Sequence, residues 1–158
     1  MNKIIILVLS FLCISSAAFA DDRQSAMNFF NNYVKAANSY DMNLGRFYSP
    51  KAVIIRQVVK PDGSTANAYT DTNTYVKQMK LSASTAKIRK YTNTYRNINI
   101  VPYNGGYKIS AERQPKGEKY WLKIYQVLKK QPNGSWIITE EMMQTKEQIF
   151  LLYVKGNK

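Results

Sequence analysis

Apolar residues near the start of the chain recur with the period of a helix. From residue 26 they fall at i, i+3, i+4, i+7, i+8 and i+11, with Asn and Lys residues between them. Residues three and four apart share one face of a helix, so this spacing predicts a single amphipathic helix. We expect this face to be core, and the alternative is that part of it floors a pocket. Its residues are Ala26, Phe29, Phe30, Tyr33, Val34 and Ala37.

The next segments read as a short helix, a strand and a third helix. Asp41 can cap the short helix, and Pro50 ends it because the residue before a proline avoids helical geometry. Residues 52–59 are rich in β-branched side chains, which favour a strand. A turn at residues 60–64 follows. Asp71 or a neighbouring threonine can then cap a third helix.

The second half of the chain has the period of two that is typical of strands. Four runs, at residues 87–101, 107–113, 118–130 and 136–144, are separated by turn sequences that contain Gly, Pro or Asn-Gly. Alternation predicts that Trp136, Ile138, Glu140 and Met142 share one face of the last strand. Apolar residues on both faces suit a curved sheet that is covered inside by helices and outside by a partner.

The first twenty residues have the layout of a secretory signal peptide. Lys3 gives a positive start, an apolar run extends from Ile4 to Ile14, and small residues end the segment at Ala20. We predict cleavage after Ala20, a periplasmic or secreted protein, and no transmembrane segment after cleavage. An uncleaved anchor is the alternative, but a bilayer span needs roughly 20 apolar residues.

The chain is strongly basic, with 23 Lys and Arg residues against 10 Asp and Glu residues. Because Lys3 leaves with the signal peptide, 22 cations remain and the mature net charge is +12. This charge favours an anionic partner. Outside the inner membrane that partner is an envelope component, and we expect no nucleic acid. The alternative is a solvated surface of dispersed charge that keeps the protein soluble.

Two segments resemble the nuclear transport factor 2-like superfamily, also called SnoaL-like. They are FFNNYVKAANSYDMNLGRFYSPKAVII at residues 29–55 and NGSWIITEEMMQ at residues 133–144. The resemblance implies an α+β, cone-shaped domain over residues 21–144. In it three N-terminal helices pack in the concave face of a curved, mostly antiparallel sheet. Many members pair into homodimers. The apolar tail at residues 145–158 is therefore expected to pack on the sheet or on a dimer partner.

Catalytic chemistry is restricted by composition. The chain has no histidine, and its one cysteine, Cys13, leaves with the signal peptide. Histidine bases, thiol nucleophiles and their metal sites are thereby excluded. No metal site and no cofactor is expected. Enzymes of the resembling family pair a carboxylate with a partner such as Tyr inside the cone, and the acids at suitable positions are Glu140, Glu112 and Asp41.

We also expect a pocket for a small apolar or aromatic ligand. The pattern places around it Phe30, Tyr33, Tyr48, Trp121, Tyr125, Trp136 and Glu140. The leading hypothesis is an exported, non-enzymatic module that binds such a ligand or an envelope partner. The alternatives are a cofactor-free lyase or isomerase that uses a pocket carboxylate with a tyrosine, and a subunit of an envelope secretion assembly.

Overall fold

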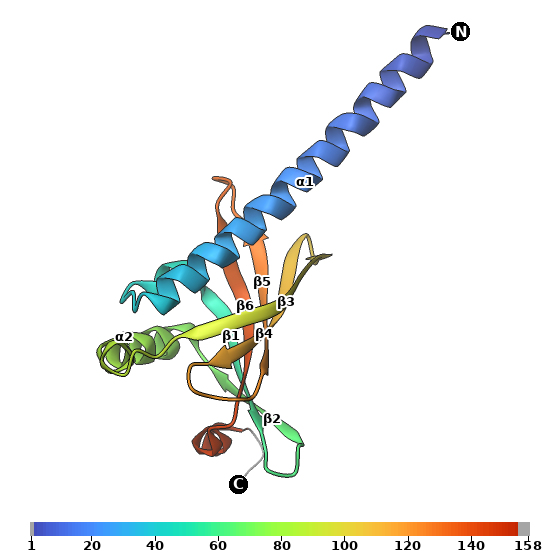
Figure 1. Cartoon of the computed structure of the whole chain (residues 1–158). Coiled ribbons are helices and arrows are strands. Elements are labelled where there is room, and N and C mark those ends of the chain that lie inside the picture. Colours follow the sequence, from blue (N-terminus) through green and yellow to red (C-terminus); the bar gives the residue numbers. More distant parts are fainter. Residues whose placement is uncertain (1, 155–158) are drawn as a thin grey trace.

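A six-stranded sheet curves around the C-terminal part of a long first helix in the computed structural model of this chain (Figure 1). The structure describes the backbone of residues 2–154 and the side chains of residues 20–154. The first half of the chain forms α1 (Asn2–Asn38), the short 3₁₀ helix η1 (Leu44–Phe47), β1 (Tyr48–Val59), β2 (Thr65–Thr70) and α2 (Thr72–Ile88). It continues through β3 (Asn93–Tyr103), β4 (Gly106–Pro115), β5 (Leu122–Lys130), β6 (Trp136–Thr145) and the 3₁₀ helix η2 (Gln148–Tyr153).

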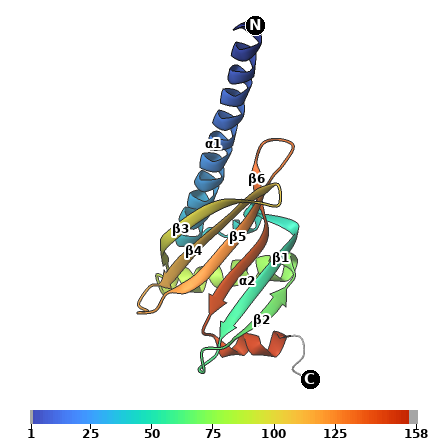
Figure 2. The same ribbon diagram turned by 90° about the vertical axis from the view of Figure 1, so that its right-hand side faces the viewer.

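The strands lie in the order β2-β1-β6-β5-β4-β3, which Figure 2 shows across one face of the sheet. The β1 and β6 strands run parallel, whereas every other neighbouring pair is antiparallel. The sheet is therefore mixed. β1 is the first strand in the sequence and β6 the last, so this parallel pair brings residues far apart in the sequence together inside the sheet.

The predicted apolar face of α1 packs on the inner face of the sheet. Ala26, Phe30 and Tyr33 are buried in the core cluster, and Phe29 contacts Phe47 edge to face with ring centroids 5.4 Å apart. Tyr33 makes the same kind of contact with Tyr48 at 6.0 Å. Edge-to-face aromatic pairs add specificity to apolar burial. They explain why this part of α1 is fixed against β1.

The prediction of three N-terminal helices is only partly correct. Among the described residues, α1 and α2 are the two α-helices, while the segment after Asp41 forms a single 3₁₀ turn. The strand β2 was missed because its sequence, TANAYT, is short and polar. Residues 87 and 88, which were predicted to begin a strand, instead continue α2, and the strand itself starts at Asn93. The fifth strand begins at Leu122 rather than at residue 118.

Asp71, one of the residues predicted to cap the third helix, is the N-cap of α2. Its carboxylate accepts a hydrogen bond from the backbone N–H of Thr74 at 2.9 Å, which satisfies a donor that the helix leaves unpaired. Asp41, which was predicted to cap the next helix, instead closes the turn before η1: it accepts from the backbone N–H of Asn43 at 2.8 Å, and no side chain caps η1.

Part of the C-terminal tail forms η2, which lies against β1 and β2 (Figure 2). The side-chain amide of Gln148 donates to the carbonyl of Val59 at 3.0 Å and attaches η2 to the end of β1. The predicted signal peptide falls on residues whose side chains lie outside the described part of the chain. In the part that is described, no helix has the length and apolar character needed to cross a bilayer.

Candidate functional site

A bulge in β6 decides which carboxylate enters the fold. Val127 of β5 pairs with Glu140, but the next residue, Leu128, pairs with Ile138, so Thr139 has no partner across the strands. One extra residue reverses the side-chain alternation beyond it. Glu141 consequently points inward beside Gln126, and Glu140 points outward beside Val127. The prediction that Glu140 shares a face with Trp136 and Ile138 is wrong for this reason.

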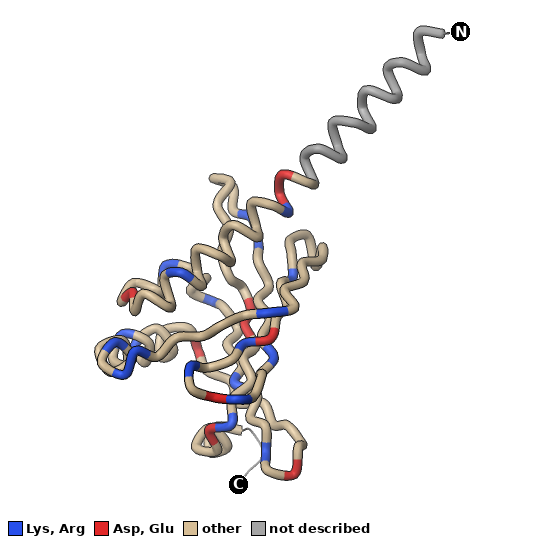
Figure 3. Tube along the Cα trace, viewed as in Figure 1, with Lys and Arg blue, Asp and Glu red and all other residues tan. Residues whose placement is uncertain are grey.

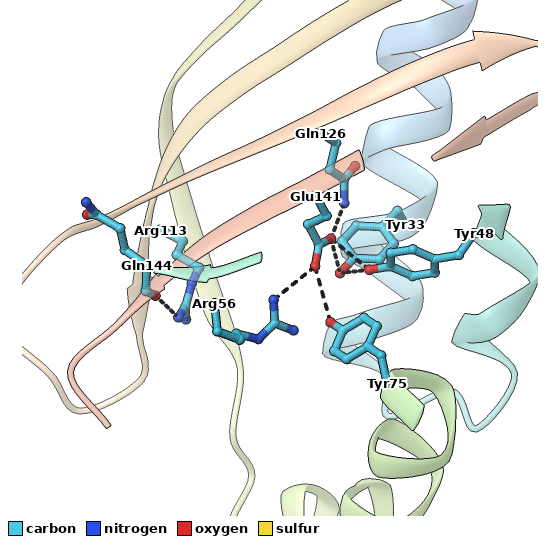
Figure 4. A network of polar contacts seen from close by, with 8 residues as sticks. All are labelled: Tyr33, Tyr48, Arg56, Tyr75, Arg113, Gln126, Glu141 and Gln144. Carbon is cyan, nitrogen blue, oxygen red and sulfur yellow. Dashed lines mark hydrogen bonds and ion pairs between the residues drawn. The ribbon is translucent and has the colours of Figure 1, made fainter. Parts of the chain in front are cut away.

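Glu141 is completely buried and is surrounded by hydrogen-bond donors (Figure 4). One carboxylate oxygen, Oε2, lies 2.7 Å from the Tyr48 hydroxyl, 3.3 Å from the Tyr33 hydroxyl and 2.9 Å from Nε2 of Gln126. The other, Oε1, lies 3.2 Å from the Tyr75 hydroxyl and 3.5 Å from Nη1 of Arg56. These five residues come from four elements, because Tyr48 and Arg56 both belong to β1. Glu141 thus ties α1, β1, α2 and β5 to β6.

The hydroxyl groups in this cluster remain protonated donors. Burial, followed by the charge of Glu141, raises the pKa of Tyr33 and of Tyr48 well above the ordinary range. Burial also raises the pKa of Tyr75, although the charge of Arg56 opposes it. The Tyr33 and Tyr48 oxygens lie 2.9 Å apart. Both hydroxyls donate to Oε2 of Glu141, and the Tyr48 hydroxyl also lies within hydrogen-bonding distance of the Tyr33 oxygen.

Arg56 connects this cluster to the molecular surface. Its guanidinium lies 4.5 Å from the centre of the Tyr75 ring, which is a favourable cation–π distance. The Arg56 guanidinium donates to Glu141 through one terminal nitrogen, and a side-chain hydrogen bond also links it to Tyr75. Arg113, the other inward-pointing arginine in Figure 4, differs, because its two terminal nitrogens donate to Asn93 Oδ1 at 2.9 Å and to the Gln144 carbonyl at 2.8 Å. Arg56 retains donors for a further partner.

A pocket of about 470 Å³, which we call the mouth pocket, lies between α2, β2 and η2. Arg56 and Tyr75 line it, and the apolar part of its wall comes from Met79 of α2 with Ile149 and Phe150 of η2. Glu141 does not line it. The pocket therefore presents the Arg56 cation among apolar and polar side chains, and the buried carboxylate of Glu141 lies behind Arg56.

The other residues predicted for the site are dispersed. Phe30 lies in the core, and Trp136 donates from its indole N–H to the Ser25 hydroxyl at 3.1 Å. The Trp121 ring lies 4.0 Å from the Arg96 guanidinium. On the outer face, the Tyr125 hydroxyl donates to Glu140 at 2.6 Å. Of the seven predicted pocket residues, the structure brings together two pairs on opposite faces of the sheet: Tyr125 with Glu140 outside, and Tyr33 with Tyr48 inside, beside a carboxylate that was not predicted.

The two remaining candidate acids are held in surface ion pairs. Glu112 accepts from Nε of Arg96 at 2.8 Å, and this hydrogen bond is the main reason why the pKa of Glu112 is lowered. The pKa of Asp41 is lowered first by the N–H of Asn43 and then by Arg46, which lies 2.6 Å away. A lowered pKa favours the ionised form, which suits an ion pair. In the described part of the chain, no three His, Cys, Asp or Glu residues group as metal ligands would.

Searches for related sequences and structures gave different results. No family model matches the chain, and no curated protein matches it. A nuclear transport factor 2-like protein with a cystatin-like fold from Novosphingobium aromaticivorans superposes with a TM-score of 0.62 and 9% identity, over 85% of this chain and 88% of that one. The chain has the nuclear transport factor 2-like fold. The predicted resemblance is confirmed at the level of fold.

Two further structural neighbours of this chain have names that mention an activity. A candidate ketosteroid isomerase from Shewanella frigidimarina has a TM-score of 0.55 and 18% identity, over 75% of this chain and 94% of that one. A candidate dehydratase from Streptomyces avermitilis has a TM-score of 0.56 and 7% identity, over 79% and 96%. At these identities the comparison establishes the fold alone, because this fold hosts unrelated functions.

Sequence reasoning missed Glu141, Arg56 and Tyr75 as members of one cluster. Tyr75 falls in the predicted third helix and Arg56 in the predicted strand at residues 52–59, and neither was singled out as a site residue. Glu141 was hidden by the bulge at Thr139. One signal was present: Arg56 is the only cation within the run AVIIRQVV at residues 52–59. A charge inside a buried strand is usually paired, so it indicated an inward carboxylate.

Proposed function

We propose that this protein is an exported, non-enzymatic module that holds a small ligand in the mouth pocket. The observation that carries the proposal is the position of Arg56. Its guanidinium lines the pocket and has unused donors, whereas the carboxylate behind it is fully buried and already accepts from five groups. Arg56 is therefore placed to bind a ligand in the pocket, whereas the buried Glu141 does not line the pocket.

The ligand that fits best has an apolar or aromatic body and one anionic group. A guanidinium binds carboxylates, sulfonates and phosphates through directed N–H donors. Met79, Ile149 and Phe150 offer apolar contacts on the walls. Ligand sites commonly combine apolar walls with placed polar groups, and the mouth pocket combines these apolar side chains with Arg56, Thr70, Gln78 and Ser82.

An anionic aromatic dye, anilinonaphthalene sulfonate, provides a direct test with a matched pair of variants. We expect saturable binding that Ile149→Glu weakens about tenfold, because a like charge a few ångströms away costs on the order of 1 kcal/mol near a protein surface. Ile149 lines the pocket. Leu152 lies on the same short helix, is exposed, and does not line the pocket. Leu152→Glu adds the same charge and should leave binding within about twofold.

Two results decide between the pocket and the basic surface as the dye site. A selective loss in Ile149→Glu supports the mouth pocket. Equal losses in the two variants, or no saturable binding, would contradict the proposal. Export is tested on the same sample, since mass spectrometry of protein purified from the periplasm should give a chain that begins at Asp21.

A second function, a cofactor-free lyase or isomerase, has one observation in its favour. A buried carboxylate lies beside tyrosine hydroxyls, and such a pair can abstract a proton and stabilise the enolate that results. The carboxylate in this reading is Glu141 rather than the predicted Glu140. Isomerisation of a β,γ-unsaturated ketosteroid that is lost in Glu141→Gln and kept in Glu140→Gln would support it. A wild-type protein without this activity would leave the binding module as the better account of the cluster.

A further inference from the structure

The outward side of α2 exposes large aliphatic side chains that pack on nothing. Leu81 and Ile88 are each 82% exposed, the highest values among the large apolar residues whose exposure the structure describes. They are seven residues apart, so they lie two turns apart on one stripe of the helix. Lys77 and Ser84 fall on the same stripe, and Tyr75 and Met79 on the opposite side pack toward the core.

Every charged residue of α2 and of the loop that follows it is basic. Between Thr72 and Tyr91 there are five cations and no acidic residue. These cations are Lys77, Lys80, Lys87, Arg89 and Lys90. Figure 3 shows them gathered on α2 and the loop that follows, at one edge of the molecule. None of them takes part in a salt bridge with a described residue. Their charge is therefore available to a partner.

The combination of exposed aliphatics and unpaired cations identifies the kind of partner. An anionic lipid surface offers phosphate groups to the lysines and an acyl boundary to the aliphatic side chains, and amphipathic basic helices bind in this way. Nucleic acid would use the lysines alone and gives no role to Leu81 or Ile88. A solvated face needs only the lysines, whereas Leu81 and Ile88 add apolar contacts on the same stripe as Lys77.

We infer that the stripe formed by Lys77, Leu81, Ser84 and Ile88, flanked by Lys80 and Lys87, docks the protein on an anionic phospholipid membrane. This α2 surface would lie flat on the headgroups, with Leu81 and Ile88 inserted and the lysines at phosphate level. The inference does not depend on what the mouth pocket binds.

Sedimentation with lipid vesicles tests the inference. Vesicles of equal parts phosphatidylglycerol and phosphatidylcholine should bind the protein, and pure phosphatidylcholine vesicles should not. Replacing Lys77 and Lys87 by Gln should lower the partition coefficient about thirtyfold, since each lysine near an anionic surface contributes about fivefold. Replacing Leu81 and Ile88 by Ser should lower it about tenfold or more, because the inserted aliphatic area is lost.

Matched controls separate this surface from the general charge of the protein. Lys116→Gln with Lys119→Gln removes two exposed cations from the loop before β5, and Leu152→Ser removes an exposed aliphatic on η2. Both controls should bind within about twofold of wild type. Every variant carries the same N-terminus, so any contribution from that segment cancels. The circular dichroism of the α2 variants should be unchanged, because the replaced side chains are exposed.

Three outcomes would overturn the inference. The first is an equal loss for the α2 variants and the controls, which would indicate non-specific attraction by net charge. The second is full retention of binding after Leu81 and Ile88 are replaced, which would remove the insertion. The third is tighter binding to duplex DNA than to the anionic vesicles at the same salt concentration, which would assign the surface to nucleic acid.

Discussion

Glu141 is the residue on which the interior of this molecule depends. A fully buried carboxylate is costly unless it is paired and hydrogen-bonded, and here five donors from four other elements satisfy it. Gln126 illustrates how specific the arrangement is. Its Nε2 donates to Glu141, but its buried Oε1 has no partner among the described residues. The cluster is organised to serve one acceptor.

Neutralising this acceptor should destabilise the protein. We expect Glu141→Gln to lower the free energy of unfolding by about 3–5 kcal/mol, because it leaves Arg56 without its buried counter-charge and turns an amide N–H₂ toward donors. Glu140→Gln is the matched control. It changes the adjacent residue on the outer face, keeps an acceptor for Tyr125, and should shift stability by no more than about 0.5 kcal/mol. Urea unfolding measures both.

The opposite result would assign another role to the carboxylate. If Glu141→Gln is as stable as wild type, or more stable, the protein holds this charge at a cost in stability. Such a cost is typical of a residue kept for activity. The enzyme alternative would then gain support over the binding module.

At the scale of elements, periodicity located most helices and strands but not their irregularities. The stripe from Ala26 to Ala37 predicted the part of α1 that packs on the sheet, because three of its residues are buried there. The bulge at Thr139 has no periodic signature, since it depends on pairing with β5. It moved the inward position from Glu140 to Glu141, and so the candidate site could not be predicted from alternation in β6 alone.

Two other elements show the same limit. The residues of β2 form a strand because β1 is beside them, not because TANAYT has strong strand propensity. The residues around Lys87 have a mixed pattern, and α2 runs through them to its C-cap at Arg89, whose backbone N–H donates to the carbonyls of Lys87 and Thr85. In both places tertiary pairing or capping outweighed the local preference of the sequence.

The short helix η2 closes one side of the mouth pocket and should contribute to stability. Ending the chain after Gln148 removes Phe150 and Leu151, which are half-buried against the domain. We expect a loss of about 1–2 kcal/mol, in line with partial burial of two large apolar side chains. Thermal and urea unfolding of the shortened chain measure it, with Leu152→Ser as a control that should have no effect. An unchanged melting temperature would show that η2 adds nothing to this domain.

The whole molecule separates three regions with different chemistry. The inside of the cone is filled by the core and the Glu141 cluster. The mouth pocket combines Arg56 with apolar walls, and the α2 surface carries cations with exposed aliphatics. The homodimer stays a prediction, and so does the cleavage after Ala20. The central claim is that the buried carboxylate organises the interior while ligand is held outside it, at Arg56.

A crystal structure of the protein purified from its native source tests that claim most directly, because a natural ligand can remain bound through purification. Our account predicts density in the mouth pocket, with an anionic group within hydrogen-bonding distance of the Arg56 guanidinium and with the Tyr33, Tyr48 and Tyr75 hydroxyls still directed at Glu141. A ligand inside the cone that contacts the Glu141 carboxylate, with one or more of these tyrosines turned away, would contradict it.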